Sequence, residues 1–175
     1  LNTGKMVWLR DLVREEGCPL PPWGFSASPE ILEEDVLYHV GGKGNGNIIA
    51  LDPTTGKTRW SVGQDLKAGY AQPIVIDIAG AQQLICWGPN KIMGLAIGGG
   101  EEYWNIPYEV KYGVSIAKPI FKEDIVLVCG YWNGSRAIQV SDGGRKARVL
   151  WSEEEKLRGL TVSYTHLRAH ETELH

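Results

Sequence analysis

Tryptophan recurs in this chain at nearly regular intervals, and in three stretches a glycine precedes it by four residues. The pairs are Gly4 and Trp8, Gly56 and Trp60, and Gly100 and Trp104. A fourth, looser stretch ends at Trp151, so successive tryptophans of the series are 52, 44 and 47 residues apart. Such a period indicates stacked copies of one small structural unit, because a single unit of this size cannot bury its own apolar face.

A second marker, Ala-x-Pro, keeps the same period along the chain. It occurs at Ala27 and Pro29, at Ala71 and Pro73, and at Ala117 and Pro119. Its prolines lie 44 and 46 residues apart, close to the tryptophan spacing. Two unrelated markers with one period establish the repeat.

Each unit contains four short runs of β-branched and aromatic residues, separated by Gly, Pro, Asn and Asp, which predict strands. The predicted strands are residues 26–32, 35–42, 47–52 and 57–62, then 73–78, 83–88, 92–96 and 101–104, then 119–122, 124–130, 137–140 and 148–151. Residues 3–8 are expected to form the last strand of a preceding unit, and no helical period is evident before residue 152. The chain is therefore predicted to be all-β, a partial β-propeller of about three four-stranded antiparallel blades.

The turn between the third and fourth strands of the first unit reads DPTTGK, and its residues account for its shape. The carboxylate of Asp52 is placed to accept hydrogen bonds from backbone N–H groups that follow it. Pro53 presets φ for a type I turn, and Gly56 supplies the left-handed position that closes the hairpin. The tryptophan four residues later is expected to begin the outermost strand and to cover the neighbouring unit.

The pattern Ala-x-Asp-x-x-x-Gly-x-x-x-Trp resembles the tryptophan-docking motif of propeller repeats of the pyrroloquinoline-quinone (PQQ)-like family. It is complete at Ala50, Asp52, Gly56 and Trp60, whereas Gly94 and Ala96 replace Ala and Asp in the next unit. WD40 blades would show Trp-Asp pairs, which are absent from these motifs, and a kelch pattern does not align. The resemblance covers about residues 1–152, and residues 1–161 are expected to be a fragment of such a propeller.

The resemblance implies two functions of different kinds. Some members of the family are non-catalytic scaffolds of outer-membrane assembly, and this chain is expected to be such a binding module of the cell envelope. Other members are quinoprotein dehydrogenases, which hold PQQ and calcium and oxidise alcohols or sugars. No residue here matches their calcium ligands, so these cofactors are expected only in the full-length protein, and enzymatic activity stays open. The family resemblance also implies a periplasmic or secreted location.

The connections that lead into the first strand of each blade combine glycine with aromatic and basic residues. They contain Trp23, Lys67, Tyr70, Lys111 and Tyr112, and in propellers such connections surround one end of the axial channel. Flat rings beside lysines suit a planar anionic ligand or a protein surface. We therefore expect this propeller face to bind a protein or a small molecule. The alternative is that these rings pack between blades.

The last residues break the repeat. Residues 162–172 read VSYTHLRAHET and resemble, without a mismatch, the translation of a transposase sequencing adapter. Residues 162–175 are therefore expected to be a non-native tail. The spacing of His166 and His170 would otherwise suit a helical zinc site, but with the tail set aside no metal site is predicted.

Charge and hydropathy argue against nucleic-acid binding and against a membrane-spanning segment. The net charge of −3 provides no basic surface for nucleic acid. No apolar run approaches the roughly 20 residues that a membrane-spanning helix requires, so no membrane span is expected within these residues.

Overall fold

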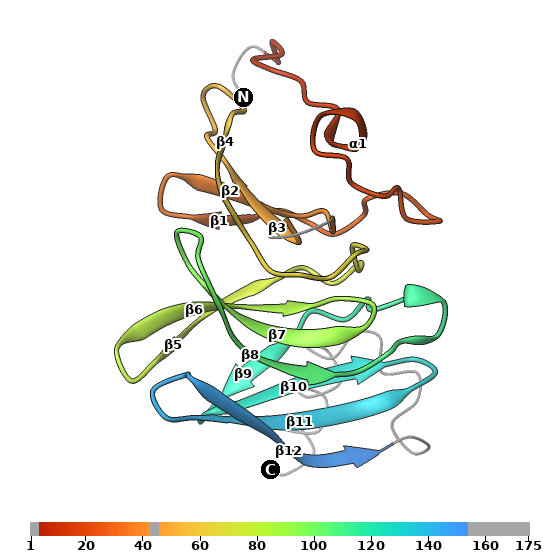
Figure 1. Ribbon diagram of the computed structural model, residues 1–175, viewed down its shortest axis with the longest axis vertical. Helices are drawn as coiled ribbons and strands as arrows, with labels where there is room; N and C mark the ends of the chain where they lie inside the picture. Colours follow the sequence, from red (N-terminus) through yellow and green to blue (C-terminus); the bar gives the residue numbers. More distant parts are fainter. Residues whose placement is uncertain (1–3, 43–45, 154–175) are drawn as a thin grey trace, which may run out of the picture.

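The computed structural model describes residues 4–42 and 46–153. Its strands form three four-stranded antiparallel sheets, which are stacked along the long axis of the molecule (Figure 1). Within each sheet the strands follow one another in chain order, so each sheet is one unit of the repeat. The prediction of an all-β chain with three four-stranded antiparallel blades is confirmed.

All twelve predicted strands are present. The first blade contains β1 (Glu30–Leu32), β2 (Asp35–His39), β3 (Ile48–Leu51) and β4 (Thr58–Val62). The second blade contains β5 (Ile74–Ile78), β6 (Ala81–Trp87), β7 (Lys91–Ala96) and β8 (Glu102–Pro107). The third blade contains β9 (Ile120–Lys122), β10 (Ile125–Gly130), β11 (Gly134–Ser141) and β12 (Lys146–Glu153). The bounds differ from the prediction by a few residues at most strand ends.

The N-terminal segment departs from the prediction. Residues 4–8 do not form a strand, because a strand needs a hydrogen-bonded neighbour and no described strand pairs with them. Two short helical turns, α1 (Leu12–Glu15) and η1 (Lys111–Gly113), were not predicted. A single turn is too short to show an apolar period, and α1 begins instead at a capping residue, Asp11, whose side chain accepts a hydrogen bond from Arg14 N.

The tryptophans of the repeat occupy equivalent positions in the three sheets. Each lies on the fourth strand of its blade and pairs with a small residue of the third strand. The pairs are Trp60 with Ala50, Trp104 with Gly94, and Trp151 with Ala137. In every blade the register shifts immediately beside this pair, because the fourth strand has one extra residue there. A Cβ on Gly94 would lie 2.2 Å from Trp104 Nε1, so the indole leaves no space for a side chain opposite it.

The DPTTGK turn has the predicted structure. Asp52 Oδ1 accepts hydrogen bonds from Thr54 N at 2.9 Å and from Thr55 N at 2.8 Å, and Gly56 has a φ of 71°. Arg59 binds the other carboxylate oxygen at 2.5 Å, and this bond together with the turn amides holds the pKa of Asp52 well below its usual range. The residues of the predicted motif therefore build a rigid hairpin end.

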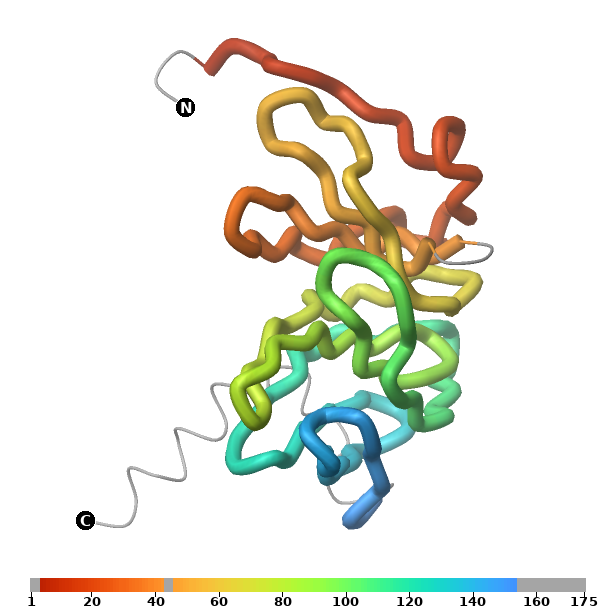
Figure 2. Tube along the Cα trace, turned by 60° about the vertical axis from the view of Figure 1, so that its left-hand side comes forward, coloured from red at the N-terminus to blue at the C-terminus, as the bar shows by residue number. Residues whose placement is uncertain are grey.

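This turn receives the first tryptophan of the chain. Trp8 Nε1 donates a hydrogen bond to Pro53 O at 2.7 Å, and a Cβ on Gly56 would lie 2.6 Å from the Trp8 ring. The N-terminal segment consequently runs beside the β3–β4 hairpin of the first blade (Figure 2). Gly100 lies in the β7–β8 turn with open space around it, whereas a Cβ on its neighbour Gly99 would lie 3.3 Å from Trp60 Cβ.

The core lies between the sheets. Leu37, Ile48 and Val62 of the first blade form one cluster with Leu84, Met93 and Leu95 of the second, and Trp60 packs against it. The second and third blades share a larger cluster that includes Trp104. Trp151, on the outer strand of the third blade, is 43% exposed. Trp60 and Trp104 thus stabilise contacts between blades, as the repeat predicts.

Candidate functional site

The connections between blades lie along one side of the stack, at the same ends of the strands, and we call this side the crossover end. Residues 63–73 lead from β4 to β5, residues 108–119 lead from β8 to β9, and the segment before β1 arrives at the same end. The β6–β7 and β10–β11 hairpins also lie there, on the right-hand side of Figure 1. The antiparallel order makes this inevitable. The first and third strands of each blade start, and the second and fourth end, on the same side of the stack.

The two crossovers form the walls of a groove of about 450 Å³. Lys67 and Tyr70 come from the first crossover, and Glu109 and Tyr112 come from the second. The remaining lining residues are Pro21, Pro22, Leu66, Ala68, Pro89, Asn90, Val110 and Gly113. Three of the five residues singled out in the sequence therefore line one hollow.

A second hollow of about 270 Å³ adjoins the first and shares Tyr70 with it. Trp23 lines this second hollow, and its ring meets the Tyr70 ring edge to face with centroids 6.0 Å apart. Trp23 N also lies 3.4 Å from Tyr70 Oη, to which it donates a hydrogen bond. Lys111 stands beside the groove, with Nζ 5.2 Å from the centroid of the Tyr112 ring. The structure thus brings all five predicted residues to one face.

Tyr112 is held in a backbone conformation that costs free energy. Its φ of 62° and ψ of 10° are left-handed, which costs a non-glycine residue about 1 kcal/mol. The conformation is fixed from both sides, because Lys111 N donates to Asn133 Oδ1 at 2.9 Å and Gly113 N donates to Val110 O at 2.8 Å. The ring is 62% exposed, so the strained backbone presents it to solvent.

Two further aromatic residues of the crossover end were missed in the sequence. Trp132 meets the ring of Tyr112 edge to face at 5.4 Å, and Tyr131 meets Trp132 at 4.8 Å. Both lie in the β10–β11 hairpin of the third blade. The available signal was the pair of adjacent aromatic residues directly before Asn-Gly, a turn sequence that exposes its neighbours.

Buried polar contacts hold the groove walls in place. The Asp65 carboxylate, which is buried, accepts hydrogen bonds from Asn90 N at 3.1 Å and from Asn90 Nδ2 at 2.6 Å. This contact joins the first crossover to the β6–β7 hairpin. Tyr70 N donates to Ser115 O at 2.8 Å and so joins the two crossovers directly. The groove is therefore preformed by the fold.

A second buried network lies at the base of the crossovers. His39 Nε2 lies 3.2 Å from Asn47 Nδ2, 3.4 Å from Gly69 N and 3.6 Å from Cys86 Sγ. Burial lowers the pKa of His39 to about 4, although the backbone of Ala71 acts weakly in the opposite direction. Burial also raises the pKa of the Cys86 thiol. The side chains of His39, Asn47 and Cys86 are all buried, so this network joins the first and second blades out of contact with solvent.

A comparison with known families decides the membership of this chain. The profile of the family described as outer membrane protein assembly factor BamB matches residues 1–172. The chain belongs to the BamB-like family of PQQ-repeat propellers. The solved structure of BamB from Moraxella catarrhalis matches 85% of this chain and 40% of its own length, with 22% identity and a TM-score of 0.44. The BamB-like chain thus spans less than half of that protein, and no curated protein matches it.

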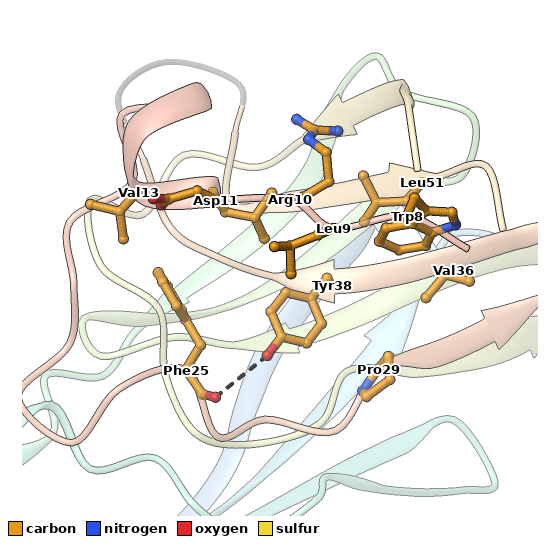
Figure 3. A pocket seen from close by; sticks show the side chains of 11 residues that line it. Trp8, Leu9, Arg10, Asp11, Val13, Phe25, Pro29, Val36, Tyr38 and Leu51 are labelled. Carbon is orange, nitrogen blue, oxygen red and sulfur yellow. Dashed lines mark hydrogen bonds between the residues drawn. The ribbon is translucent and has the colours of Figure 1, made fainter. Parts of the chain in front are cut away.

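Another hollow of this BamB-like chain, of about 660 Å³, lies between the N-terminal segment and the outer face of the first blade (Figure 3). Apolar side chains of Leu9, Val36 and Tyr38 line it, and Tyr38 Oη donates to Phe25 O at 3.4 Å. The guanidinium of Arg10 points away from the hollow and pairs with Glu15 and Glu16. The hollow is therefore lined mainly by apolar side chains.

Membrane spans and metal clusters were sought among residues 4–42 and 46–153. No helix there has the length and hydropathy of a membrane-spanning segment. No group of three or more His, Cys, Asp or Glu side chains in those ranges is close enough to bind a metal ion. Binding of PQQ and calcium by the full-length protein stays a prediction, as does the origin of residues 162–175, which lie outside the described residues.

Proposed function

We propose that this chain is part of a non-catalytic propeller of the cell envelope that binds a protein partner through its crossover end. The supporting observation is the concentration of large exposed apolar side chains there. They are Leu20, Trp23, Leu66, Tyr112, Ile116, Tyr131 and Trp132. At the opposite end of the described blades, Ile31 is similarly exposed. The other large exposed apolar side chains lie on the N-terminal segment and on β12: Met6, Val7, Leu9, Val13, Val149, Leu150 and Trp151.

The two ends also differ in charge. The hairpins of the end opposite the crossovers present exposed carboxylates, namely Glu33, Glu34, Asp77, Glu101, Glu123, Asp124 and Asp142. Charged residues are depleted in the centre of protein interfaces, whereas Tyr and Trp are enriched. An apolar patch with aromatic anchors, rimmed by polar residues, is the usual sign of a protein-binding surface. The crossover end has these properties and the acidic end lacks them.

The chemistry of the described residues supports binding over catalysis. The histidine and cysteine that lie close together, His39 and Cys86, are buried beneath the crossovers, away from solvent. The groove above them presents rings, prolines and Lys67, with Lys111 beside it, and these groups suit recognition. The alternative function, part of a PQQ- and calcium-dependent dehydrogenase, receives no specific support from these residues.

The family suggests where this binding takes place. Its members are described as outer membrane protein assembly factors. We place this chain on the periplasmic side of the outer membrane, and we expect its partner to be a protein of the outer-membrane assembly machinery. The partner would contact Tyr112 of the second crossover and Tyr131 of the β10–β11 hairpin, which share the face of the first crossover.

Photo-crosslinking in the full-length protein tests this proposal. A photoreactive phenylalanine analogue replaces Tyr112 or Tyr131 at the crossover end, and Glu123 at the acidic end serves as the matched control. The expected result is a crosslink to an outer-membrane assembly component from the first two positions and none from the third. Equal crosslinking from all three positions, or crosslinking from Glu123 alone, would contradict the proposal.

A further inference from the structure

We infer that the segment of the partner that enters the crossover end is an extended polyproline-type peptide with an acidic residue beside its prolines. This inference rests on the proposed function and names the chemistry of the partner at that site. It depends on the shape of the two adjoining hollows, on the hydrogen-bonding groups that their walls offer, and on the charges beside them.

The two adjoining hollows together form an elongated depression with aromatic walls, which we call the furrow. Tyr70 lines both hollows. Tyr112 lines the larger one and Trp23 lines the smaller one. Three prolines, Pro21, Pro22 and Pro89, line the larger hollow. Grooves walled by aromatic rings are what polyproline peptides dock into, because their rigid, preformed helix packs its rings between the ridges at little entropic cost.

The wall offers no continuous row of backbone donors for a β-strand to pair with, because several of its N–H groups are already bonded and others are replaced by proline. Tyr70 N donates to Ser115 O, Val110 N donates to Pro89 O, and Gly113 N donates to Val110 O. Asn90 N is bound by Asp65, and the three lining prolines have no N–H group. Addition of a strand needs a free row of alternating donors and acceptors. A polyproline peptide needs no such row, and its own prolines bring no donors that would lose water unpaired.

The aromatic rings also supply side-chain donors. Trp23 is 63% exposed and carries an indole N–H, and Tyr112 carries a hydroxyl on an exposed ring. Tyr70 Oη accepts a hydrogen bond from Trp23 N and keeps its own hydrogen to donate. Ring donors spaced along a furrow suit the carbonyl groups of a polyproline helix, which are fully available because that helix has no internal hydrogen bonds.

The charge beside the furrow selects the flanking residue of the peptide. Lys67 lines the larger hollow and Lys111 stands beside the Tyr112 ring, whereas Glu109 supplies the single carboxylate among the lining residues. Among the exposed charges, Lys67 and Lys111 stand against Glu109, while the nearby Asp65 carboxylate is buried and bound by Asn90. These exposed ammonium groups favour an acidic residue next to the prolines, since complementary charge steers and orients a partner. A basic residue in that place would face like charge.

The test uses the full chain and three fluorescein-labelled peptides, read by fluorescence anisotropy. The first peptide is EEPPLPPLP, the second replaces its prolines with alanine, and the third replaces its glutamates with lysine. The first peptide is expected to bind at least about tenfold more tightly than either of the others. Equal affinity for all three peptides, or no binding of the first, would overturn the inference.

Variants locate the binding site. Tyr112→Ala and Trp23→Ala are expected to weaken binding of the first peptide about tenfold, as loss of an aromatic anchor does. Lys67→Glu should lower the affinity for the first peptide, which carries glutamates, and raise the affinity for the third, which carries lysines. Ile31→Ala is the control, because this exposed side chain lies at the opposite end of the first blade and lines neither hollow, and it should change the affinity less than about twofold. An equal effect of the control variant would refute the assignment to the furrow.

The outcome separates this inference from the proposed function. Loss of peptide selectivity with an intact crosslink from Tyr112 would overturn the polyproline peptide and leave the protein partner in place. Vesicles of phosphatidylglycerol and phosphatidylethanolamine form a further arm. Binding to these vesicles that Tyr112→Ala abolishes, without binding of any peptide, would replace the peptide with a lipid surface.

Discussion

Acidification should destabilise this protein through one buried side chain, His39. The pKa of its imidazole is lowered from 6.5 to about 4 because the ring is fully buried. Above pH 6.5 the ring is neutral in both states and contributes nothing to the pH dependence. Below that pH the unfolded chain binds a proton that the folded chain refuses, so the free energy of unfolding falls until the pH reaches about 4.

The size of the loss follows from the shift in pKa. Each unit of difference corresponds to about 1.4 kcal/mol, so the interval between pH 6.5 and about 4 amounts to roughly 3 kcal/mol. This is a large part of the stability of a typical domain. The network of Asn47 and Gly69, both bound to Nε2, would have to open for the ring to accept a proton there.

Urea unfolding between pH 7 and pH 4, with His39→Gln as the comparison, isolates this effect. Glutamine is neutral throughout and offers an oxygen that can accept from Asn47 Nδ2 and Gly69 N. Carboxylates titrate in both proteins and cancel in the difference. The difference in unfolding free energy between the two proteins should therefore change by about 3 kcal/mol over this range. A difference that stays constant would show that His39 titrates normally in the folded state and would refute the reasoning.

Three further outcomes follow from packing and hydrogen bonding. Trp104→Ala should lower the free energy of unfolding by about 3–5 kcal/mol, because the ring is 7% exposed, whereas Trp151→Ala, 43% exposed, should cost about 1 kcal/mol in the same urea titration. Gly56→Ala should cost at least about 1 kcal/mol more than Gly143→Ala, since both have positive φ but only the first would overlap a docked indole; equal losses in thermal melts would contradict this. Asp65→Asn should weaken the groove wall by about 2 kcal/mol and speed amide exchange in residues 63–73, and unchanged exchange would contradict the bracing role.

Several features of the fold were already determined by local sequence. The turn at Asp52 and Gly56 is made by hydrogen bonds and a φ angle that involve neighbouring residues only, so its structure was predictable. The strands were predictable for the same reason, because β-branched runs between turn residues need no distant partner to be recognised. The spacing of Trp60 and Trp104 then implied equivalent places in successive blades, which the pairing with Ala50 and Gly94 confirms.

The site was predicted in part. The sequence placed Trp23, Tyr70 and Tyr112 at one end, because strand direction forces every crossover to that edge. It did not show that Tyr70 divides two hollows or that Trp132 supports Tyr112. These relations join loops of different blades, and nothing in the local sequence sets the distance between such loops.

Local sequence therefore determined the strands, the turns, the number of blades and the face on which the aromatic residues lie. Tertiary structure decided which rings meet, which donors stay free and which histidine is deprived of water. The physical reason is the range of the interactions. Turn hydrogen bonds and strand propensities act over a few residues, whereas grooves and desolvation arise only when sheets far apart in the sequence pack against each other.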